Sequence, residues 1–284
     1  MSEGSWRADP DIRSLLGFSE YSRKSKPIDT AMKCRRLGLK AFQLVGDFPS
    51  NFPEKSSSSE RAEVRDFITE HDLRLHFHAP TDIPLASRHN RLRLAAVDRM
   101  KDYIELARDM GASSFVFHPT RFAFLKLGSR QVVFEDGSVS RGYFQRFEDS
   151  SLRLADGANG ALPLLLENTS PMTGPFLGLL ERFLTHPSTG LAWDIGHTSA
   201  DNSGNASEIA DFFAARLDSI KLAHVHDVVD GRTHLALGSG RLNLPEYIEI
   251  FRQLRVPMII EVFSDKDLMA SLDYISSLTP TQPR

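Results

Sequence analysis

The chain has 284 residues, of which 41% are hydrophobic and 25% are charged, a balance typical of a soluble globular protein with a large core. Its formal net charge of −3 argues against a large nucleic-acid footprint, which needs a basic surface. The single cysteine, Cys34, excludes an internal disulfide framework and fits a reducing cytoplasm. No apolar run reaches the roughly 18 residues of a membrane span, and Met1–Asp11 has no signal-peptide core. We therefore expect a cytoplasmic protein that does not cross a membrane.

Strand-like runs alternate with amphipathic helical stretches at intervals of roughly 30 residues, the length of a βαβ unit. Eight short apolar runs are predicted to be strands: Leu15–Ser19, Lys40–Val45, Leu73–His78, Ser114–His118, Leu162–Glu167, Leu191–Asp194, Ile220–His224 and Val256–Glu261. The predicted helices that follow them are Pro27–Leu37, Ser58–His71, Arg91–Met110, Gly142–Ala155, Phe176–Leu184, Ala206–Leu217, Leu244–Leu254 and Lys266–Leu278. Between the fourth strand and its helix, Arg121–Arg141 is predicted to be an irregular flap.

This alternation predicts an α/β fold, the (β/α)8 TIM barrel, because alternating units give parallel strands and eight of them close a ring. An open doubly wound sheet is the alternative, and ligand-type residues that recur at strand ends through the eighth run favour the barrel. Neither G-x-G-x-x-G after the first run nor G-x-x-x-x-G-K-[ST] is present, so both nucleotide-binding motifs are missing. With no dividing linker, the sequence predicts one domain over 1–284, with units over about 15–278 and polar tails.

The last four predicted strands end in residues that bind divalent cations: Glu167, Asp194, His224 and Glu261. Active sites of such barrels lie at the C-terminal ends of the strands, so these side chains are expected to meet there. Three carboxylates and one imidazole suit Mn²⁺, Zn²⁺, Co²⁺ or Mg²⁺, and buried carboxylates would repel one another without a compensating cation. A salt bridge at a strand end would explain any one of them equally well, but the four together predict a metal site.

The histidines need separate weighing, because a lone histidine is more often structural than a ligand. His76 and His78 share one face of the third run, and His78 is nearer the barrel mouth. His118 ends the fourth run. Their place beside the predicted cluster makes His78 and His118 candidates for a second metal. No role is assigned to three histidines on predicted helices or surface loops, His71, His89 and His186.

Seven segments carry a family resemblance: His-Ala-Pro at 78–80, His-Pro at 118–119, Glu-Asn at 167–168, Asp-Ile-Gly-His at 194–197, His-Val-His-Asp at 224–227, His-Leu-Ala-Leu-Gly-Ser-Gly at 234–240 and Ile-Glu-Val at 260–262. In their order and spacing they resemble the xylose isomerase-like TIM barrel superfamily. That superfamily includes endonuclease IV and sugar epimerases of the tagatose 3-epimerase type. The resemblance runs from the first strand to the eighth, and it does not specify a reaction.

The resemblance implies a metal site shared by the isomerases and nucleases of the family, formed here by Glu167, Asp194, His224 and Glu261. His78 and His118 match the pair that, with the bridging glutamate, holds a second zinc in endonuclease IV. His197 and His234 match two imidazoles of a third zinc site, but Arg232 stands where that site has an aspartate. A cationic side chain is expected to repel a third metal, which argues against a trinuclear phosphodiesterase site.

The leading hypothesis is a metal-dependent isomerase or epimerase of a small sugar or polyol-derived ketone, working through an enediolate. Glu167 and Glu261 are the predicted catalytic proton carriers, and the predicted substrate-binding residues are His197, Arg232 and His234. The alternatives are a phosphodiesterase at abasic DNA sites and a metal-dependent amide hydrolase. The expected partner is a small-molecule substrate rather than nucleic acid or a membrane, and a homo-oligomer stays open.

Overall fold

The structure, a computed structural model, describes residues 8–119, 124–133, 140–158, 160, 162–169, 174–200 and 206–278. Its parallel strands form a closed barrel in the order β1-β12-β9-β8-β7-β4-β3-β2. The barrel strands are β1 (Leu16–Glu20), β2 (Ala41–Val45), β3 (Arg74–His78), β4 (Ser114–Phe117), β7 (Leu164–Glu167), β8 (Thr189–Asp194), β9 (Ile220–Val225) and β12 (Met258–Ile260). They coincide with the eight predicted runs, which confirms the (β/α)8 barrel and excludes the open sheet.

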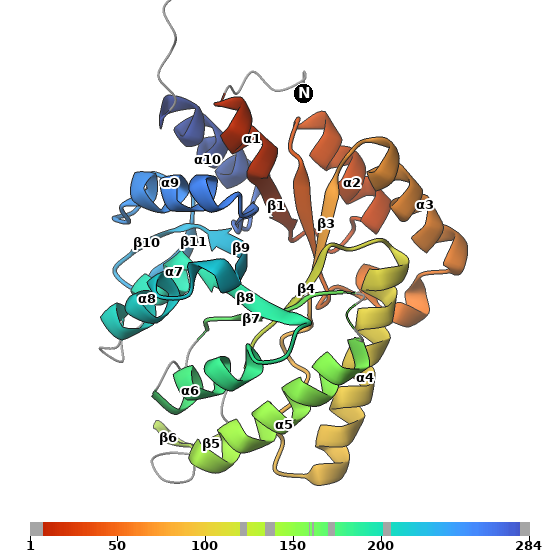
Figure 1. The fold of residues 1–284 in the computed structure, drawn as a ribbon, viewed down its shortest axis with the longest axis vertical. Coiled ribbons are helices and arrows are strands. Elements are labelled where there is room, and N and C mark those ends of the chain that lie inside the picture. Colours follow the sequence, from red (N-terminus) through yellow and green to blue (C-terminus); the bar gives the residue numbers. More distant parts are fainter. Residues whose placement is uncertain are drawn as a thin grey trace, which may run out of the picture.

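The helices surround this barrel (Figure 1). Those that correspond to the predicted ones are α2 (Pro27–Arg36), α3 (Ser58–Glu70), α4 (Asn90–Asp109), α5 (Ser140–Ala158), α6 (Gly174–Phe183), α8 (Ala206–Ala214), α9 (Leu244–Leu254) and α10 (Asp265–Leu278). Short 3₁₀ turns lie at Pro49–Asn51, Pro53–Lys55 and Leu217–Ser219. Among the described helices, none has the length and apolarity needed to cross a bilayer.

Local sequence signals explain where several helices begin and end. The Ser57 hydroxyl accepts a hydrogen bond from the Glu60 amide, and the Glu60 carboxylate accepts one from the Ser57 amide, which forms a capping box at the start of α3. Helix α4 ends just before Gly111, whose φ of +77° is readily adopted by glycine. A capping serine and a glycine after the last turn thus mark these two helix ends in the sequence.

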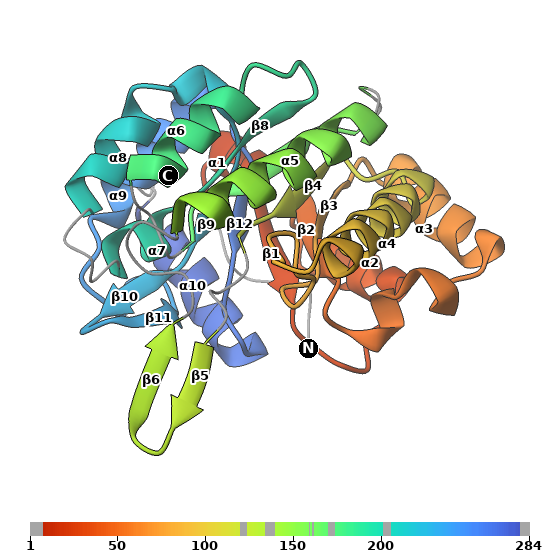
Figure 2. The same ribbon diagram turned by 90° about the horizontal axis from the view of Figure 1, so that it is seen from below.

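Several of the described elements were not predicted, and the β5–β6 pair corrects a prediction. Helices α1 (Pro10–Leu15) and α7 (Ile195–Ala200) and the antiparallel ribbon of β10 (Asp227–Val229) with β11 (Arg232–Leu235) are additions to the barrel units. The prediction of an irregular flap over Arg121–Arg141 is wrong at its centre, where β5 (Phe124–Leu127) pairs antiparallel with β6 (Arg130–Val133). A Gly128-Ser129 turn with φ of +62° at Gly128 joins two strands rich in apolar residues. Figure 2 shows this hairpin projecting away from the barrel, and residues 120–123 and 134–139 lie outside the described part.

The barrel interior is filled by side chains that point inward from alternate strand positions. One buried cluster consists of Ala41, Val116, Leu165, Ala192, Leu222 and Ile259, from six different strands. Strand β1 contributes Gly17, where a Cβ atom would lie 2.5 Å from the carbonyl oxygen of Ala41, too close for any side chain. The interior is therefore close-packed below the barrel mouth, and this packing fixes the height at which the strand-end side chains stand.

We predict that Leu165→Ala lowers the free energy of unfolding by about 2–5 kcal/mol, because it opens a cavity in this interior layer. Leu125→Ala is the matched control, since Leu125 lies on β5 with 46% of its surface exposed, and it should change stability little. Urea unfolding followed by circular dichroism measures both. Equal stabilities for the two variants would show that the interior layer is not closely packed.

Candidate metal centre

Metal-binding side chains converge at the C-terminal ends of the barrel strands. The first group is Glu167, Asp194, His224 and Glu261, and one ligand atom from each lies within 4.8 Å of the others. Glu167, Asp194 and His224 stand at the ends of β7, β8 and β9, and Glu261 directly follows β12. All four residues are buried, with at most 4% of the surface of any of them exposed. The structure thus brings together the four residues that the sequence predicts as a metal site.

Glu167 also belongs to a second group, with His78 and His118. Its Oε1 atom lies 2.9 Å from Nδ1 of His224, and its Oε2 atom lies 3.2 Å from Nε2 of His78. The rings of His78 and His118 are 5.3 Å apart. One carboxylate therefore faces both groups, as a ligand that bridges two cations must. His76 lies deeper on β3, where its Nδ1 atom hydrogen-bonds to Ser114 Oγ, and it joins neither group.

A third group contains a residue that sequence reasoning missed. His197, His226 and His234 lie within 4.8 Å of one another by one nitrogen each. The Nε2 atom of His226 is 3.1 Å from Asp194 Oδ1, so this group adjoins the first through Asp194. The missed signal was the two-residue period of the strand: His226 stands two positions after His224, on the same face of the chain.

Arg232 was predicted to contact substrate and to repel a third metal, and the structure places it outside the described lining of the site cavity. Arg232 lies on β11 with an exposed side chain, and it is not among the described residues that line the site cavity. At His234 the backbone φ is +56°, an uncommon value for a non-glycine residue, and it breaks the alternation that would put Arg232 and His234 on one face. His234 reaches the site, whereas Arg232 does not line it.

The loop that carries His234 is held by Asp227, which explains two of the sequence motifs. The two carboxylate oxygens of Asp227 accept hydrogen bonds from four backbone amides, those of Val228, Gly238, Gly240 and Leu242. A Cβ atom at position 240 would lie 2.3 Å from Asp227 Oδ1, so only glycine lets the backbone approach this closely. The buried aspartate after His226 therefore fixes the glycine-rich turn after His234.

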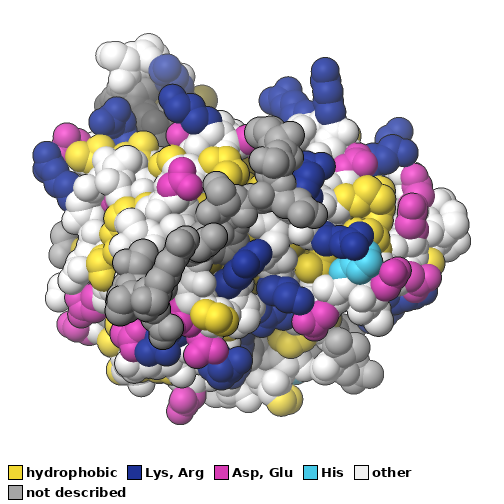
Figure 3. All heavy atoms as spheres, turned by 90° about the horizontal axis from the view of Figure 1, so that it is seen from above, with side chains coloured by type: hydrophobic (Ala, Val, Ile, Leu, Met, Phe, Trp, Pro, Cys, Tyr) yellow, Lys and Arg dark blue, Asp and Glu magenta, His cyan; other side chains and the backbone are white. Residues whose placement is uncertain are grey.

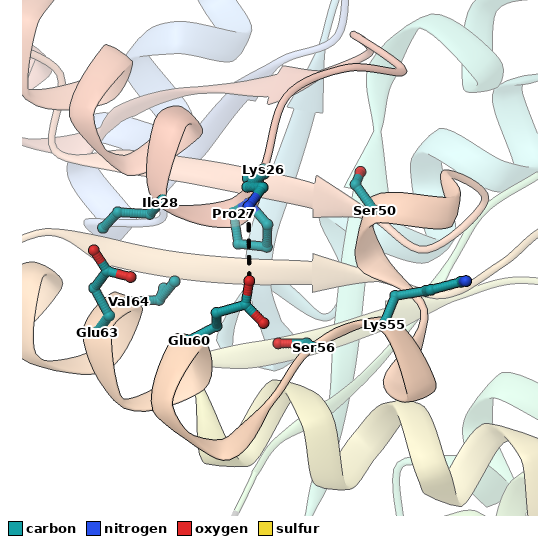
Figure 4. Close-up of a pocket in the computed structure, with 9 residues that line it drawn as sticks. All are labelled: Lys26, Pro27, Ile28, Ser50, Lys55, Ser56, Glu60, Glu63 and Val64. Carbon is teal, nitrogen blue, oxygen red and sulfur yellow. Dashed lines mark ion pairs between the residues drawn. The ribbon is translucent and has the colours of Figure 1, made fainter.

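All three groups border one cavity of about 720 Å³. It is lined by Tyr21, Val45, Asp47, Phe48, His78, Thr81, Asp82, Pro84, His118, Pro119, Glu167, Thr169, His197, His234, Glu261 and Phe263. No lysine or arginine stands among these described lining residues. Figure 4 shows a smaller cavity, of about 190 Å³, between the start of α2 and helix α3. That cavity contains the Lys26–Glu60 ion pair but no residue of the three groups, so the larger one is the candidate site.

Two polar residues on the early strands support the ligands and were also missed. Gln43 on β2 donates from Nε2 to Glu261 Oε1 at 2.8 Å, and its Oε1 atom lies 3.0 Å from His224 Nε2. Ser19 on β1 donates to the same Glu261 oxygen at 3.0 Å. Both residues are buried, and each lies within its strand rather than at the strand's last residue. The sequence prediction considered ligands at strand ends, so it did not identify them.

The electrostatics of the first group are dominated by its buried carboxylates. Burial alone would raise the pKa of Glu167, but the facing His224 and His78 outweigh burial and hold that pKa well below its usual value. Burial alone would lower the pKa of His224, but the Glu261 and Glu167 carboxylates raise it to about 10. Burial likewise opposes ionisation of Asp194, and His226 and His197 keep its pKa low. Glu167 and Asp194 therefore stay ionised, and positive charge must compensate them.

The donor set fits a divalent cation. Carboxylate oxygens and imidazole nitrogens gather within ligand distance of one another in three adjoining groups, and no thiolate is present in any of them. In the metal-free protein, protonated imidazoles supply the positive charge that faces the carboxylates. A bound cation would supply this charge in their place. Glu167, Asp194, His224 and Glu261 would hold one cation, and His78 with His118 would share Glu167 with another.

We predict that cation binding releases protons. His224 must be neutral to bind a cation, and with a pKa of about 10 it is protonated in the metal-free protein at neutral pH. The apparent affinity should therefore rise with pH up to about 10, with about one proton released per cation from this group. Isothermal titration calorimetry with Zn²⁺ or Mn²⁺, in buffers of different ionisation enthalpy, measures the release. His71→Gln, on a ring that contacts Phe67, is the control and should behave as wild type; binding without proton release near neutral pH would contradict the prediction.

Comparison with known proteins places these residues in a family. The model of the family described as xylose isomerase-like TIM barrel matches residues 32–278. Among curated proteins, one named "Probable endonuclease 4" from Mycobacterium tuberculosis (strain ATCC 25177 / H37Ra) is 28% identical over 204 residues, which cover 66% of this chain and 73% of the relative. Another of that name, from Symbiobacterium thermophilum, is 31% identical over 138 residues, or 48% of this chain and 45% of the relative.

Solved structures share the fold over almost the whole chain. A D-tagatose 3-epimerase-like protein superimposes with a TM-score of 0.72 at 20% identity, covering 93% of this chain and 96% of that one. The D-allulose 3-epimerase from Methylomonas sp. superimposes with a TM-score of 0.68 at 16% identity, covering 95% and 98%. At these identities the likeness concerns the fold, whereas the family match spans most of the sequence. The chain belongs to the xylose isomerase-like TIM barrel family.

Proposed function

We propose that this protein is a metal-dependent isomerase or epimerase that acts on a small sugar or polyol-derived ketone. The observation that carries the proposal is the placement of two buried glutamates on either side of one imidazole. Glu167 Oε1 lies 2.9 Å from Nδ1 of His224, and Glu261 Oε1 lies 3.5 Å from Nε2. Both glutamates also line the 720 Å³ cavity, so each can reach a small molecule bound there.

In this proposal the two glutamates are the proton carriers. One removes the proton from the carbon next to the substrate carbonyl, and the other delivers a proton to the carbon from its own side. A divalent cation in the first group supplies positive charge that stabilises negative charge on substrate oxygens. Mn²⁺, Zn²⁺, Co²⁺ and Mg²⁺ all suit the donors.

Substrate orientation falls to residues that border the cavity. His197 and His234 line it from helix α7 and strand β11, so their ring nitrogens can hydrogen-bond substrate hydroxyl groups. Arg232, with its exposed side chain, is not retained in this role. Epimerase names among the structural neighbours support a sugar substrate: besides the tagatose and allulose types they include a 3-keto-D-glucoside 4-epimerase from E. coli, with a TM-score of 0.68 at 15% identity.

We expect Glu167→Gln and Glu261→Gln each to lower turnover by about 10²–10⁴-fold at saturating metal, because an amide cannot carry the proton. Turnover is measured on a panel of ketoses in D₂O, with NMR detection of deuterium at the carbon next to the carbonyl. The wild type should incorporate deuterium at that carbon. Glu105→Gln, on an exposed position of α4, is the matched control and should keep full activity. Retained turnover in metal-loaded Glu167→Gln would contradict the proton-transfer role.

A second candidate function is supported by the number of ligand groups. His78 and His118 with Glu167, and His197, His226 and His234 beside Asp194, extend the site toward the multinuclear arrangement of a hydrolase or phosphodiesterase. The sequence relatives named as endonuclease 4 agree with it. Against nucleic acid stand the net charge of −3 and a cavity whose described lining has no lysine or arginine. On the face shown in Figure 3, Lys and Arg side chains lie among Asp and Glu side chains.

Metal content separates the two candidates. The purified protein is dialysed to remove loosely bound metal, and its metal content is measured by inductively coupled plasma mass spectrometry. If the protein is an epimerase, one tightly bound cation per chain should remain. The first group has four donors, two of them carboxylates that no other group shares, so it should fill first. Three tightly bound zinc ions per chain, lost selectively in His78→Gln and His226→Gln, would favour the phosphodiesterase, and two would favour a hydrolase.

A further inference from the structure

Gln43 stands at a place where a buried amide touches two predicted ligands at once. The side chain is fully buried on β2, between Ser19 of β1 and His76 of β3 in the strand register. Its Nε2 atom donates to Ser19 Oγ at 2.8 Å and to Glu261 Oε1 at 2.8 Å. Its Oε1 atom lies 3.0 Å from His224 Nε2. Both amide hydrogens and the carbonyl oxygen therefore have partners.

The carboxylate of Glu261 determines which way this amide points. If the amide were turned over, its oxygen would face the Glu261 oxygen at hydrogen-bond distance, and two acceptors would repel each other. The NH₂ group must therefore face Glu261, and the carbonyl oxygen must face His224. Since an amide oxygen only accepts hydrogen bonds, the Nε2 atom of His224 has to carry the hydrogen.

This hydrogen leaves the other ring nitrogen of His224 for a cation. In the neutral imidazole only one nitrogen is protonated, so a hydrogen on Nε2 leaves the lone pair on Nδ1. Nδ1 lies 2.9 Å from Glu167 Oε1, on the side of the shared carboxylate. Two atoms with lone pairs at that distance repel each other unless a proton or a cation is bound between them. The same amide also occupies Oε1 of Glu261, together with Ser19, so Oε2 is the oxygen left for a cation or a substrate.

We propose that Gln43 is a positioning residue of the metal centre, which holds His224 as the Nε2–H tautomer and fixes the orientation of the Glu261 carboxylate. The inference rests on the metal centre in the proposed function and adds a residue to it that binds neither cation nor substrate. Partners of this kind orient metal ligands, and their loss typically weakens metal binding by about 10–100-fold.

The first test compares the Zn²⁺ affinities of variants, by competition with a chromophoric chelator. Gln43→Met keeps the volume of the side chain and removes its polar atoms, and it should bind Zn²⁺ about 10–100-fold more weakly than the wild type. Asn51→Leu is the matched control, because Asn51 is another buried amide near the end of β2, donating to Val45 O and touching no ligand. It should keep the wild-type affinity. Wild-type affinity in folded Gln43→Met, or an equal loss in Asn51→Leu, would overturn the proposal.

The second test needs no variant and therefore does not depend on Gln43→Met folding. In the Zn²⁺-bound wild type, long-range ¹H–¹⁵N NMR spectra of ¹⁵N-histidine protein report which ring nitrogen of His224 carries hydrogen, assigned through the loss of its signals in His224→Gln. The proposal requires hydrogen on Nε2 and zinc on Nδ1. Hydrogen on Nδ1 would overturn the role of Gln43 while leaving the metal centre standing, whereas a wild type that binds no Zn²⁺ would overturn the metal centre itself.

Discussion

Mutual repulsion among three buried carboxylates is the constraint on which the site depends. Glu167, Asp194 and Glu261 are almost completely buried and lie within ligand distance of one another. Ionised carboxylates in such surroundings are costly unless positive charge faces them. In the metal-free protein the imidazoles supply it, since burial lowers the pKa of His78, His224 and His226 but the facing carboxylates outweigh burial and raise it. A divalent cation relieves the same repulsion more directly, which is why this end of the barrel is suited to hold one.

The barrel makes this arrangement of charge possible. Parallel strands deliver their last residues to one end, and the close-packed layer beneath keeps those residues at a common level. The early strands β1 and β2 end at Glu20 and Val45, and Glu20 pairs with Lys33 and belongs to none of the three ligand groups. Ser19 and Gln43 on these strands instead hydrogen-bond to Glu261, the ligand that follows β12. Asp227 fastens the loop that carries His234. The metal-binding residues and the residues that hydrogen-bond to them thus come from different strands, but they all act on the same group of charges.

Most of the barrel and of its first ligand group follows from the sequence, because both depend on short-range patterns. A period of two inside each strand and an acidic or imidazole residue at its end predict where the ends meet. His226 follows from the same period, because it stands two positions beyond His224, the predicted end of its strand. Gln43 does not follow from any local pattern, since a polar residue in mid-strand acquires its partners only through the register of β1, β2, β9 and β12.

The placement of Arg232 shows another feature that sequence-based prediction misses. A position counted from a motif gives the order of residues along the chain, but a positive φ at His234 and the irregular pairing of β10 with β11 decide where each side chain points. The β5–β6 hairpin was also missed by sequence-based prediction, because a two-stranded ribbon outside the barrel adds no unit to the repeating pattern of strand and helix. Additions to a fold are harder to predict than its repeat.

The central claim is that Glu167, Asp194, His224 and Glu261 together bind one divalent cation. X-ray diffraction from crystals grown with Zn²⁺, with anomalous differences recorded on both sides of the zinc absorption edge, tests it most directly. The account predicts a zinc peak about 2.0–2.2 Å from carboxylate oxygens of Glu167, Asp194 and Glu261 and from a ring nitrogen of His224. A barrel mouth with no zinc peak among these four side chains, at a Zn²⁺ concentration that saturates binding in solution, would contradict it.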